Sequence, residues 1–219
     1  MTEDLGVTFF GLLLTLSLAP LALQGAGFVG RPRSRPRRES TYKVAAGALL
    51  IIGTIALALD LAGARRGVLL LLTVPSLDVF LAWTALATGF CLAIWAAARP
   101  FARTPPRAEL LPRNAGERTF LLVGAVIEEY VFRGYFLTVM LLVMIHSPFI
   151  PLALVTLCSA LFHGPRIEPV VRYMAIGVVL MLPVLATGSL LPSIVARLVL
   201  ETVSMARSAR SSSPVAPAG

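Results

Sequence analysis

The chain alternates long apolar runs with short polar stretches that are rich in arginine. Such runs predict helices, because a transmembrane barrel would show short segments of alternating polarity instead. At about 1.5 Å of rise per residue, roughly 20 apolar residues cross the hydrocarbon core of a bilayer. We therefore expect about seven membrane-spanning segments. They cover residues 5–28, 44–64, 77–98, 120–145, 147–162, 170–185 and 192–206, and a short lead-in helix covers 68–74.

Composition supports a membrane protein over a soluble one. The 219 residues are 57% hydrophobic and 14% charged, with a mean hydropathy of +0.85, which is more apolar sequence than a soluble domain uses. We predict an all-α, polytopic transmembrane helical bundle that forms a single integral membrane domain. The predicted organisation is N-terminal helices with basic loops over 1–115, a catalytic core over 116–206 and a disordered tail over 207–219.

The positive charge indicates orientation in the membrane. The net charge is +8, and all but one of the 19 basic residues are arginines. Most of them lie in the connections 29–43 and 99–119, which two spans separate, so both connections can face the cytoplasm. We predict the N-terminus outside and the C-terminus inside, with Arg65 and Arg66 as the discordant pair. We expect anionic lipid head groups rather than nucleic acid as the partner of this charge.

Three charged residues interrupt the apolar run 120–145: Glu128, Glu129 and Arg133. An ionised group at the centre of a membrane helix costs at least about 2.5–3.5 kcal/mol, so the three predict a polar cavity rather than a lipid-facing wall. Residues i and i+4 are neighbours on a helix, which pairs Glu129 with Arg133. Glu128 projects about 100° away and can face another helix. A buried ion-pair network that fixes helix packing is the competing interpretation.

The predicted topology brings an imidazole to the same side of the membrane. Glu128 lies roughly 12 Å below the predicted cytoplasmic surface, and His163 ends the next span at its cytoplasmic end. This pattern favours catalysis, with Glu128 as general base to a water molecule and Arg133 holding Glu129 ionised and oriented.

Other polar residues are weaker candidates. His146 falls at the opposite membrane face, and with only two histidines in the chain Ser159 and Ser193 lack a plausible triad. Asp60 and Asp78 fall near one membrane face, which favours structural roles. Neither a zinc-protease HExxH sequence nor a nucleophile elbow is present.

Three stretches resemble the motifs of the CPBP intramembrane proteases, also called Abi or CAAX amino-terminal proteases. Residues 128–134, EEYVFRG, match the family's EExxxR followed by Gly. Residues 159–163, SALFH, keep the His of FxxxH but have Ser at the Phe position. Residues 187–201 resemble the framework of the third motif, HxxxN, with Arg197 at the His position and Glu201 at the Asn position. The resemblance covers about 116–206.

The resemblance implies endoproteolysis within the membrane. Glu128 and His163 would activate water, Glu129 would support them, and the third-motif pair would stabilise the oxyanion. A guanidinium can donate to an oxyanion, so Arg197 can replace the imidazole, with Glu201 as its tether. Alternatively, the Arg197–Glu201 pair closes on itself and leaves an inactive protein. Carboxylates and His163 could ligate a metal, but Arg197 beside them disfavours a cation, so we expect neither metal nor other cofactor.

The resulting hypothesis is a glutamate-type intramembrane endopeptidase in a bacterial inner membrane, with its active site towards the cytoplasm. Its substrate would be a membrane-associated protein or peptide: a CAAX-like chain, a C-terminal sorting signal or a bacteriocin-related peptide. The first alternative is a catalytically inactive scaffold or immunity protein on the same helices. The second is a small transporter, because buried Glu and Arg residues also mark ion pathways, although no repeated half is evident.

Overall fold

The computed structural model describes residues 35–62, 66–98, 115–143, 149–162 and 167–211. Every regular element in these ranges is helical, which confirms the all-α prediction. The helices are α2 (Arg35–Ala62), α3 (Arg66–Leu72), α4 (Leu77–Ala97), α5 (Ala115–Glu129), the π-helix η3 (Tyr130–Phe136), α6 (Leu137–Val143), α7 (Phe149–Phe162), α8 (Ile167–Thr187) and α9 (Leu191–Ser211).

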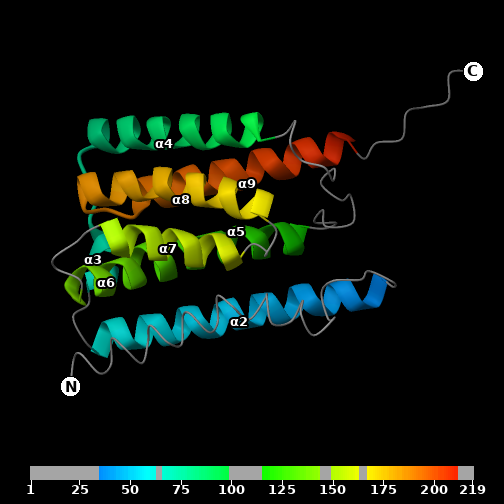
Figure 1. Ribbon diagram of the computed structural model, residues 1–219, viewed down its shortest axis with the longest axis horizontal. Helices are drawn as coiled ribbons and strands as arrows, with labels where there is room; N and C mark the ends of the chain where they lie inside the picture. Colours follow the sequence, from blue (N-terminus) through cyan, green and yellow to red (C-terminus); the bar gives the residue numbers. More distant parts are fainter. Residues whose placement is uncertain (1–34, 63–65, 99–114, 144–148, 163–166, 212–219) are drawn as a thin grey trace, which may run out of the picture.

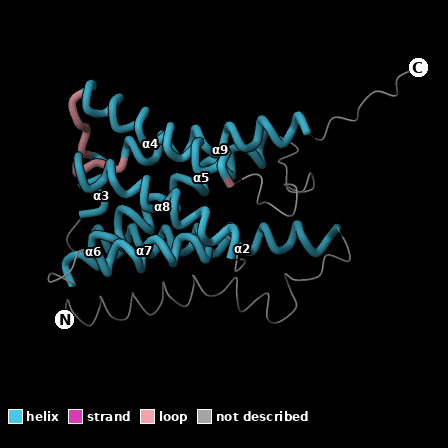
Figure 2. Tube along the Cα trace, turned by 45° about the horizontal axis from the view of Figure 1, so that its top comes forward, coloured by secondary structure: helices cyan, strands magenta, loops and turns pink. Residues whose placement is uncertain are grey.

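The long helices lie side by side in a layered bundle (Figure 1). Helices α8 and α9 both pack on α4 at one edge, and α2 packs on α5 and η3 at the other. Between these edges α9 packs on α5, and α7 packs on α8. Figure 2 shows the same arrangement from a second direction, with the short α3 at one end of the bundle. The centre of the bundle therefore consists of α5, η3, α7, α8 and α9.

Hydropathy located most helices but not all of their ends. The expected lead-in and span at 68–74 and 77–98 correspond to α3 and α4. Helix α2 begins at Arg35, within the connection 29–43, and α9 continues to Ser211, beyond the expected end at 206. Arginine, serine and alanine are compatible with helix, so backbone hydrogen bonding continues after the apolar pattern stops. The expected first span, 5–28, lies outside the described residues.

The helix expected over 120–145 contains a change of helical type. Helix α5 runs directly into η3 and then α6, which the structure describes as far as Val143. The backbone N–H of Leu137 donates to the carbonyl of Phe132, five residues earlier, as in a π-helix. Short π segments within α-helices occur frequently at functional sites. Here the π segment starts directly after the two glutamates and contains Arg133.

A hydrogen-bonded turn fixes where α9 begins. Gly188 has φ 63, a left-handed conformation that glycine adopts without a Cβ penalty. Its N–H donates to the carbonyl of Val184, which ends α8. The Ser189 hydroxyl donates to the Thr73 carbonyl at 2.6 Å, and the Leu190 N–H donates to the Leu70 carbonyl at 2.9 Å. These bonds attach the start of α9 to α3 and the residues after it.

Asp60 connects α2, α3 and η3. Its Oδ2 accepts hydrogen bonds from the Tyr130 hydroxyl at 2.9 Å and from the Val68 N–H at 2.6 Å. Only 4% of Asp60 is exposed, so it is a buried, hydrogen-bonded acceptor. These contacts give Asp60 the predicted structural role, whereas Asp78 is exposed in the first turn of α4.

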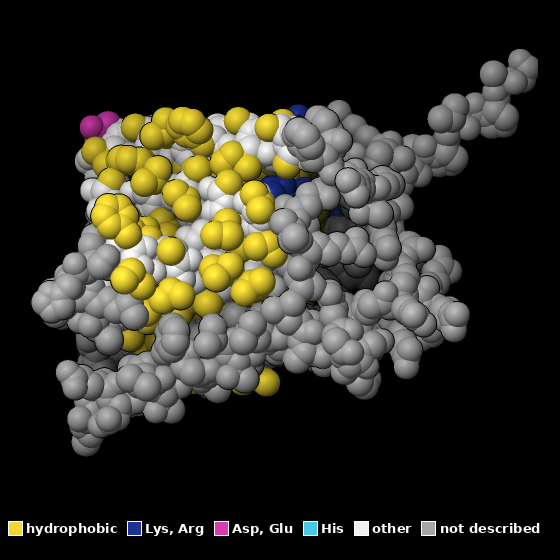
Figure 3. Space-filling view, in the orientation of Figure 1, with side chains coloured by type: hydrophobic (Ala, Val, Ile, Leu, Met, Phe, Trp, Pro, Cys, Tyr) yellow, Lys and Arg dark blue, Asp and Glu magenta, His cyan; other side chains and the backbone are white. Residues whose placement is uncertain are grey.

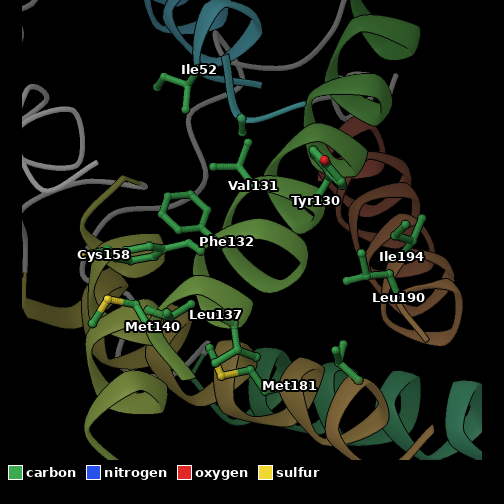
Figure 4. Packing of buried hydrophobic residues seen from close by; sticks show 14 residues of the cluster. Ile52, Tyr130, Val131, Phe132, Leu137, Met140, Cys158, Met181, Leu190 and Ile194 are labelled. Carbon is green, nitrogen blue, oxygen red and sulfur yellow. The ribbon is translucent and has the colours of Figure 1, made fainter. Parts of the chain in front are cut away.

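The main apolar core surrounds η3 (Figure 4). Val131, Phe132 and Phe136 are at most 2% exposed, and Leu190, directly before α9, is fully buried in the same cluster. A second, smaller cluster joins α4, α8 and α9. The two cores hold α9 against both α4 and η3, and this arrangement fixes the polar site between them.

The outer surface is strongly apolar. Leu77–Ala97 and Val170–Thr187 are long and apolar enough to cross a membrane, with mean hydropathies of 1.9 and 2.0. Only 11% of the first window is buried within the protein, so its apolar side chains face outward, and Figure 3 shows a broad hydrophobic face. Lipid accommodates such a surface, whereas water does not. Shorter apolar stretches lie in α2, over Leu50–Ala62, and in α7, over Phe149–Leu161. The expected number of spans and the orientation remain predictions.

Candidate active site

The two adjacent glutamates end α5 in the centre of the bundle. Glu128 is 4% exposed and Glu129 is fully buried. Arg133 and Arg197, the cations that contact them, are 2% and 3% exposed. Charges removed from water in this way are tolerated when they are paired and hydrogen-bonded. The stability of the site therefore depends on which arginine pairs with which glutamate.

Glu129 is held from its own helix and from α9. Arg133 Nη1 lies 2.5 Å from Glu129 Oε1, the i,i+4 contact that the sequence predicts. The Ser193 hydroxyl of α9 lies 2.8 Å from Glu129 Oε2 and equally far from the Leu180 carbonyl of α8, and its single proton can be donated to one of them at a time. These contacts make Glu129 a junction between η3 and α9.

Glu128 faces two other helices. Its Oε1 accepts a hydrogen bond from the Ser159 hydroxyl of α7 at 3.2 Å. Its Oε2 lies 3.3 Å from Arg197 Nη2 of α9. One carboxylate thus meets the second motif through Ser159 and the third motif through Arg197. The expectation that Glu128 faces another helix is confirmed.

Arg197 contacts more than its i,i+4 partner. The same Nη2 atom that approaches Glu128 lies 3.1 Å from Glu201 Oε1. The Arg197–Glu201 pair therefore does not close on itself, because the guanidinium bridges two carboxylates. The Glu201 side chain is 26% exposed, so it lies at the more accessible edge of the site.

Close helix packing leaves Arg133 little room. A Cβ atom on Gly177 of α8 would lie 3.0 Å from Thr156 Cγ2 and 3.4 Å from Arg133 Nη2. The absence of a side chain at Gly177 therefore lets α8 approach α7 while the guanidinium lies beside it. Gly134 has a similar role towards the turn before α9, because its Cβ would lie 2.8 Å from Leu190 Cδ1.

Two hydrogen-bonding partners of the acidic pair, Ser159 and Ser193, were missed from the sequence because serines were considered only as nucleophiles. Ser159 occupies the Phe position of the second motif, four residues before His163. Ser193 precedes Arg197 by four residues and so shares its helix face. Each of these four-residue spacings could have identified its serine as a hydrogen-bond donor to Glu128 or Glu129.

The remaining expected residues have different outcomes. His163 and His146 lie outside the described residues, so the expected approach of His163 to Glu128 stays a prediction. In the part of the chain that the structure describes, no group of three or more His, Cys, Asp or Glu side chains is placed to hold a metal ion. Arg197 supplies positive charge between Glu128 and Glu201.

Charge is nearly balanced within the site. Glu129 pairs with Arg133 and Glu128 pairs with Arg197, which leaves the partly exposed Glu201 as the additional anion. A guanidinium stabilises an ionised carboxylate through charge-assisted hydrogen bonds. The arrangement can present an ionised carboxylate and a guanidinium donor to the same reacting group.

One family model matches this part of the chain. Residues 118–203 match the model described as "Rce1-like: Type II CAAX prenyl endopeptidase Rce1-like". No curated protein and no solved structure matches the chain at a significant level. The matched residues contain both glutamates, both arginines and Glu201, and they extend from α5 into α9. The match over residues 118–203 supports membership of the CPBP (Abi/CAAX amino-terminal protease) family.

Proposed function

We propose that the protein is a glutamate-type intramembrane endopeptidase that cleaves a membrane-associated protein or peptide. The observation that carries the proposal is the convergence on Glu128. One buried carboxylate receives Ser159 from α7 and Arg197 from α9, and the motif that contains it lies in the region matching a family of endopeptidases.

In the proposed mechanism Glu128 is the general base that takes a proton from the attacking water. A positioned base of this kind contributes about 10²–10⁴-fold to the rate. His163 shares the water molecule or stabilises the charge on the carbonyl oxygen. Glu129 and Arg133 form the brace that fixes the end of α5 against η3 and α9.

The proposed role of Arg197 is to donate to the carbonyl oxygen as negative charge develops there. A guanidinium has several donor N–H groups in a fixed plane, so it can contact Glu128 and still direct another N–H towards the substrate. Glu201 limits its movement through the 3.1 Å contact. A donor placed in advance in a dry site is worth about 10²–10³-fold in rate.

For the substrate we propose a CAAX-type C-terminal segment carrying a prenyl group, in preference to a sorting signal or a bacteriocin-related peptide. The description of the matching family model supports this choice. The apolar outer helices suit a lipid-modified chain, which would reach the site from the bilayer. The proposed location is a bacterial inner membrane, with the site open towards the cytoplasm.

The test is cleavage of a farnesylated CAAX-type peptide by purified protein in liposomes. Glu128→Gln and His163→Ala should each lower the rate by at least about 10²-fold, because each removes a group that handles the proton. Asp78→Asn is the matched control, since Asp78 is exposed on α4 and lies outside the site. Equal cleavage by the wild type and both site variants would exclude the mechanism.

An inactive scaffold is the second candidate, and one contact favours it. Arg197 lies 3.3 Å from Glu128, so the proposed base is already ion-paired in the resting protein. On this alternative the network serves packing alone. Glu128→Gln would then leave the cellular phenotype intact, whereas Arg133→Leu would lower the amount of folded protein.

A further inference from the structure

Tyr173 of α8 lies beside Arg197, although nothing in the sequence singles it out. The Arg197 Cζ atom lies 5.7 Å from the centroid of the Tyr173 ring. The neighbouring Arg172 also approaches the ring, with its Cζ atom 5.2 Å from the same centroid. Both distances fall within the range of cation–π contacts. The ring thus meets the guanidinium that bridges Glu128 and Glu201.

The environment of Arg197 makes such a contact effective. Only 3% of Arg197 is exposed, and the attraction between a cation and an aromatic face is stronger where water does not compete for the cation. Arg172 is less buried, so its contact with the ring is the more hydrated of the two.

A single nitrogen of Arg197 contacts two carboxylates. Nη2 lies 3.3 Å from Glu128 and 3.1 Å from Glu201, so a small rotation of the long side chain would change both distances. Glu128 and Glu201 come from different helices and attract the guanidinium from different points. The Tyr173 ring adds a contact from a third helix, α8.

We propose that Tyr173 is a positioning residue whose ring holds the Arg197 guanidinium against Glu128. The proposal rests on the proposed endopeptidase function and adds α8 to the elements that arrange the site. Tyr173 acts through Arg197, so its loss should lower kcat while leaving KM nearly unchanged. The ring, and not the hydroxyl, carries the effect.

The first experiment measures kinetics with the farnesylated CAAX-type peptide. Tyr173→Leu should lower kcat about 10-fold or more, because small displacements of catalytic groups cost up to about 10²-fold in rate. Tyr173→Phe, which keeps the ring, should stay within about twofold of the wild type. Trp95→Leu is the control: it removes a contact with another guanidinium of α9, that of Arg207, whose Cζ atom lies 5.1 Å from the Trp95 ring.

Each kinetic outcome has a defined meaning. If Tyr173→Phe loses as much activity as Tyr173→Leu, or if Trp95→Leu loses as much, the positioning role of the ring is wrong. If Glu128→Gln retains full activity, or the wild type cleaves nothing, the proposed function fails and this inference fails with it. Loss of activity in Glu128→Gln with no change in Tyr173→Leu overturns the inference alone.

The second experiment detects the contact without any substrate. In arginine-labelled protein, the ring should shift the NMR signals of the Arg197 guanidinium, and the Arg197→Lys variant assigns them. The shift should persist in Tyr173→Phe and in Trp95→Leu, and disappear in Tyr173→Leu. Identical Arg197 signals in the wild type and Tyr173→Leu would show that the ring does not hold the guanidinium.

Discussion

At the scale of single residues, the notable feature is how four buried ionic groups share their partners. Glu129 pairs mainly within its own helix through Arg133, whereas Glu128 depends on Arg197 from a distant part of the chain. The first pair forms with the helix, and the second forms only when α9 packs against α5. Arg197 is therefore the residue whose loss affects the site most specifically.

Arg197→Gln should destabilise the protein by about 3 kcal/mol, because removing one partner leaves a buried charge without compensation. Adding Glu128→Gln should recover part of this loss, since the unpaired charge is then removed. The measurement is the free energy of unfolding in detergent for both single variants and the double variant. Arg207→Gln is the control, because Arg207 is exposed on the same helix. Strictly additive effects of the two substitutions would contradict the pairing.

The two departures in the third motif should also be coupled to each other. Arg197→His and Glu201→Asn together restore the family's residues at both positions, whereas either alone leaves one unmatched partner. We expect the double variant to cleave the peptide faster than either single variant. The check is a double-mutant cycle on kcat. Independent effects would indicate that the 3.1 Å contact between these residues has no role in the reaction.

At the scale of elements, a glycine decides how closely the start of α9 approaches the continuous helix formed by α5, η3 and α6. A Cβ on Gly134 would lie 2.8 Å from Leu190 Cδ1 and 3.2 Å from the Tyr130 ring. Leu190 is fully buried, so its side chain has little space to move. This accounts for a glycine directly after Arg133, at the centre of η3.

Gly134→Ala should therefore destabilise the protein by about 1–3 kcal/mol, the usual cost of overpacking. Gly89→Ala in α4 is the matched control, because a Cβ there meets nothing within 4 Å, and alanine is the better helix former. Unfolding free energies of the two variants should change in opposite directions. Equal stability of both would contradict the close approach of α9 to η3.

The turn between α8 and α9 gives a second prediction at this scale. Gly188→Ala places a Cβ atom at φ 63, which costs about 1–2 kcal/mol for an L-residue. Because this turn sets the start of α9, the substitution should also lower the cleavage rate. Ser189→Ala, which removes the bond to Thr73, should reproduce the loss of activity without the backbone strain. Unchanged cleavage rates in both variants would show that the turn does not influence the active site.

At the scale of the whole molecule, the distribution of charge predicts the orientation in the membrane. The arginine distribution predicts a cytoplasmic C-terminus. The native cysteines, Cys91 and Cys158, are at most 1% exposed, so they should resist a bulky maleimide. A cysteine at exposed Ala206 should react with a membrane-impermeant maleimide only when the cytoplasmic face is accessible. Labelling of this cysteine in intact cells would contradict the predicted cytoplasmic C-terminus.

The sequence by itself determined the helical class and the location of the chemistry. Long apolar runs leave few alternatives to helix, and charges in such a run are costly enough to mark a site. Spacing of four residues along a helix was sufficient to predict the contact between Glu129 and Arg133. These inferences succeed because they depend on local geometry and on the cost of charge in an apolar surrounding.

The tertiary structure decided everything that depends on contacts between distant segments. Hydropathy could not show the π-helical turn, the early start of α2 or the contact of Asp60 with Tyr130. It also could not show that Ser159 and Arg197 meet on Glu128. Hydropathy reports how a residue partitions between water and lipid. Which buried donor meets which buried acceptor follows only from the packing of α7, α8 and α9 around the two glutamates.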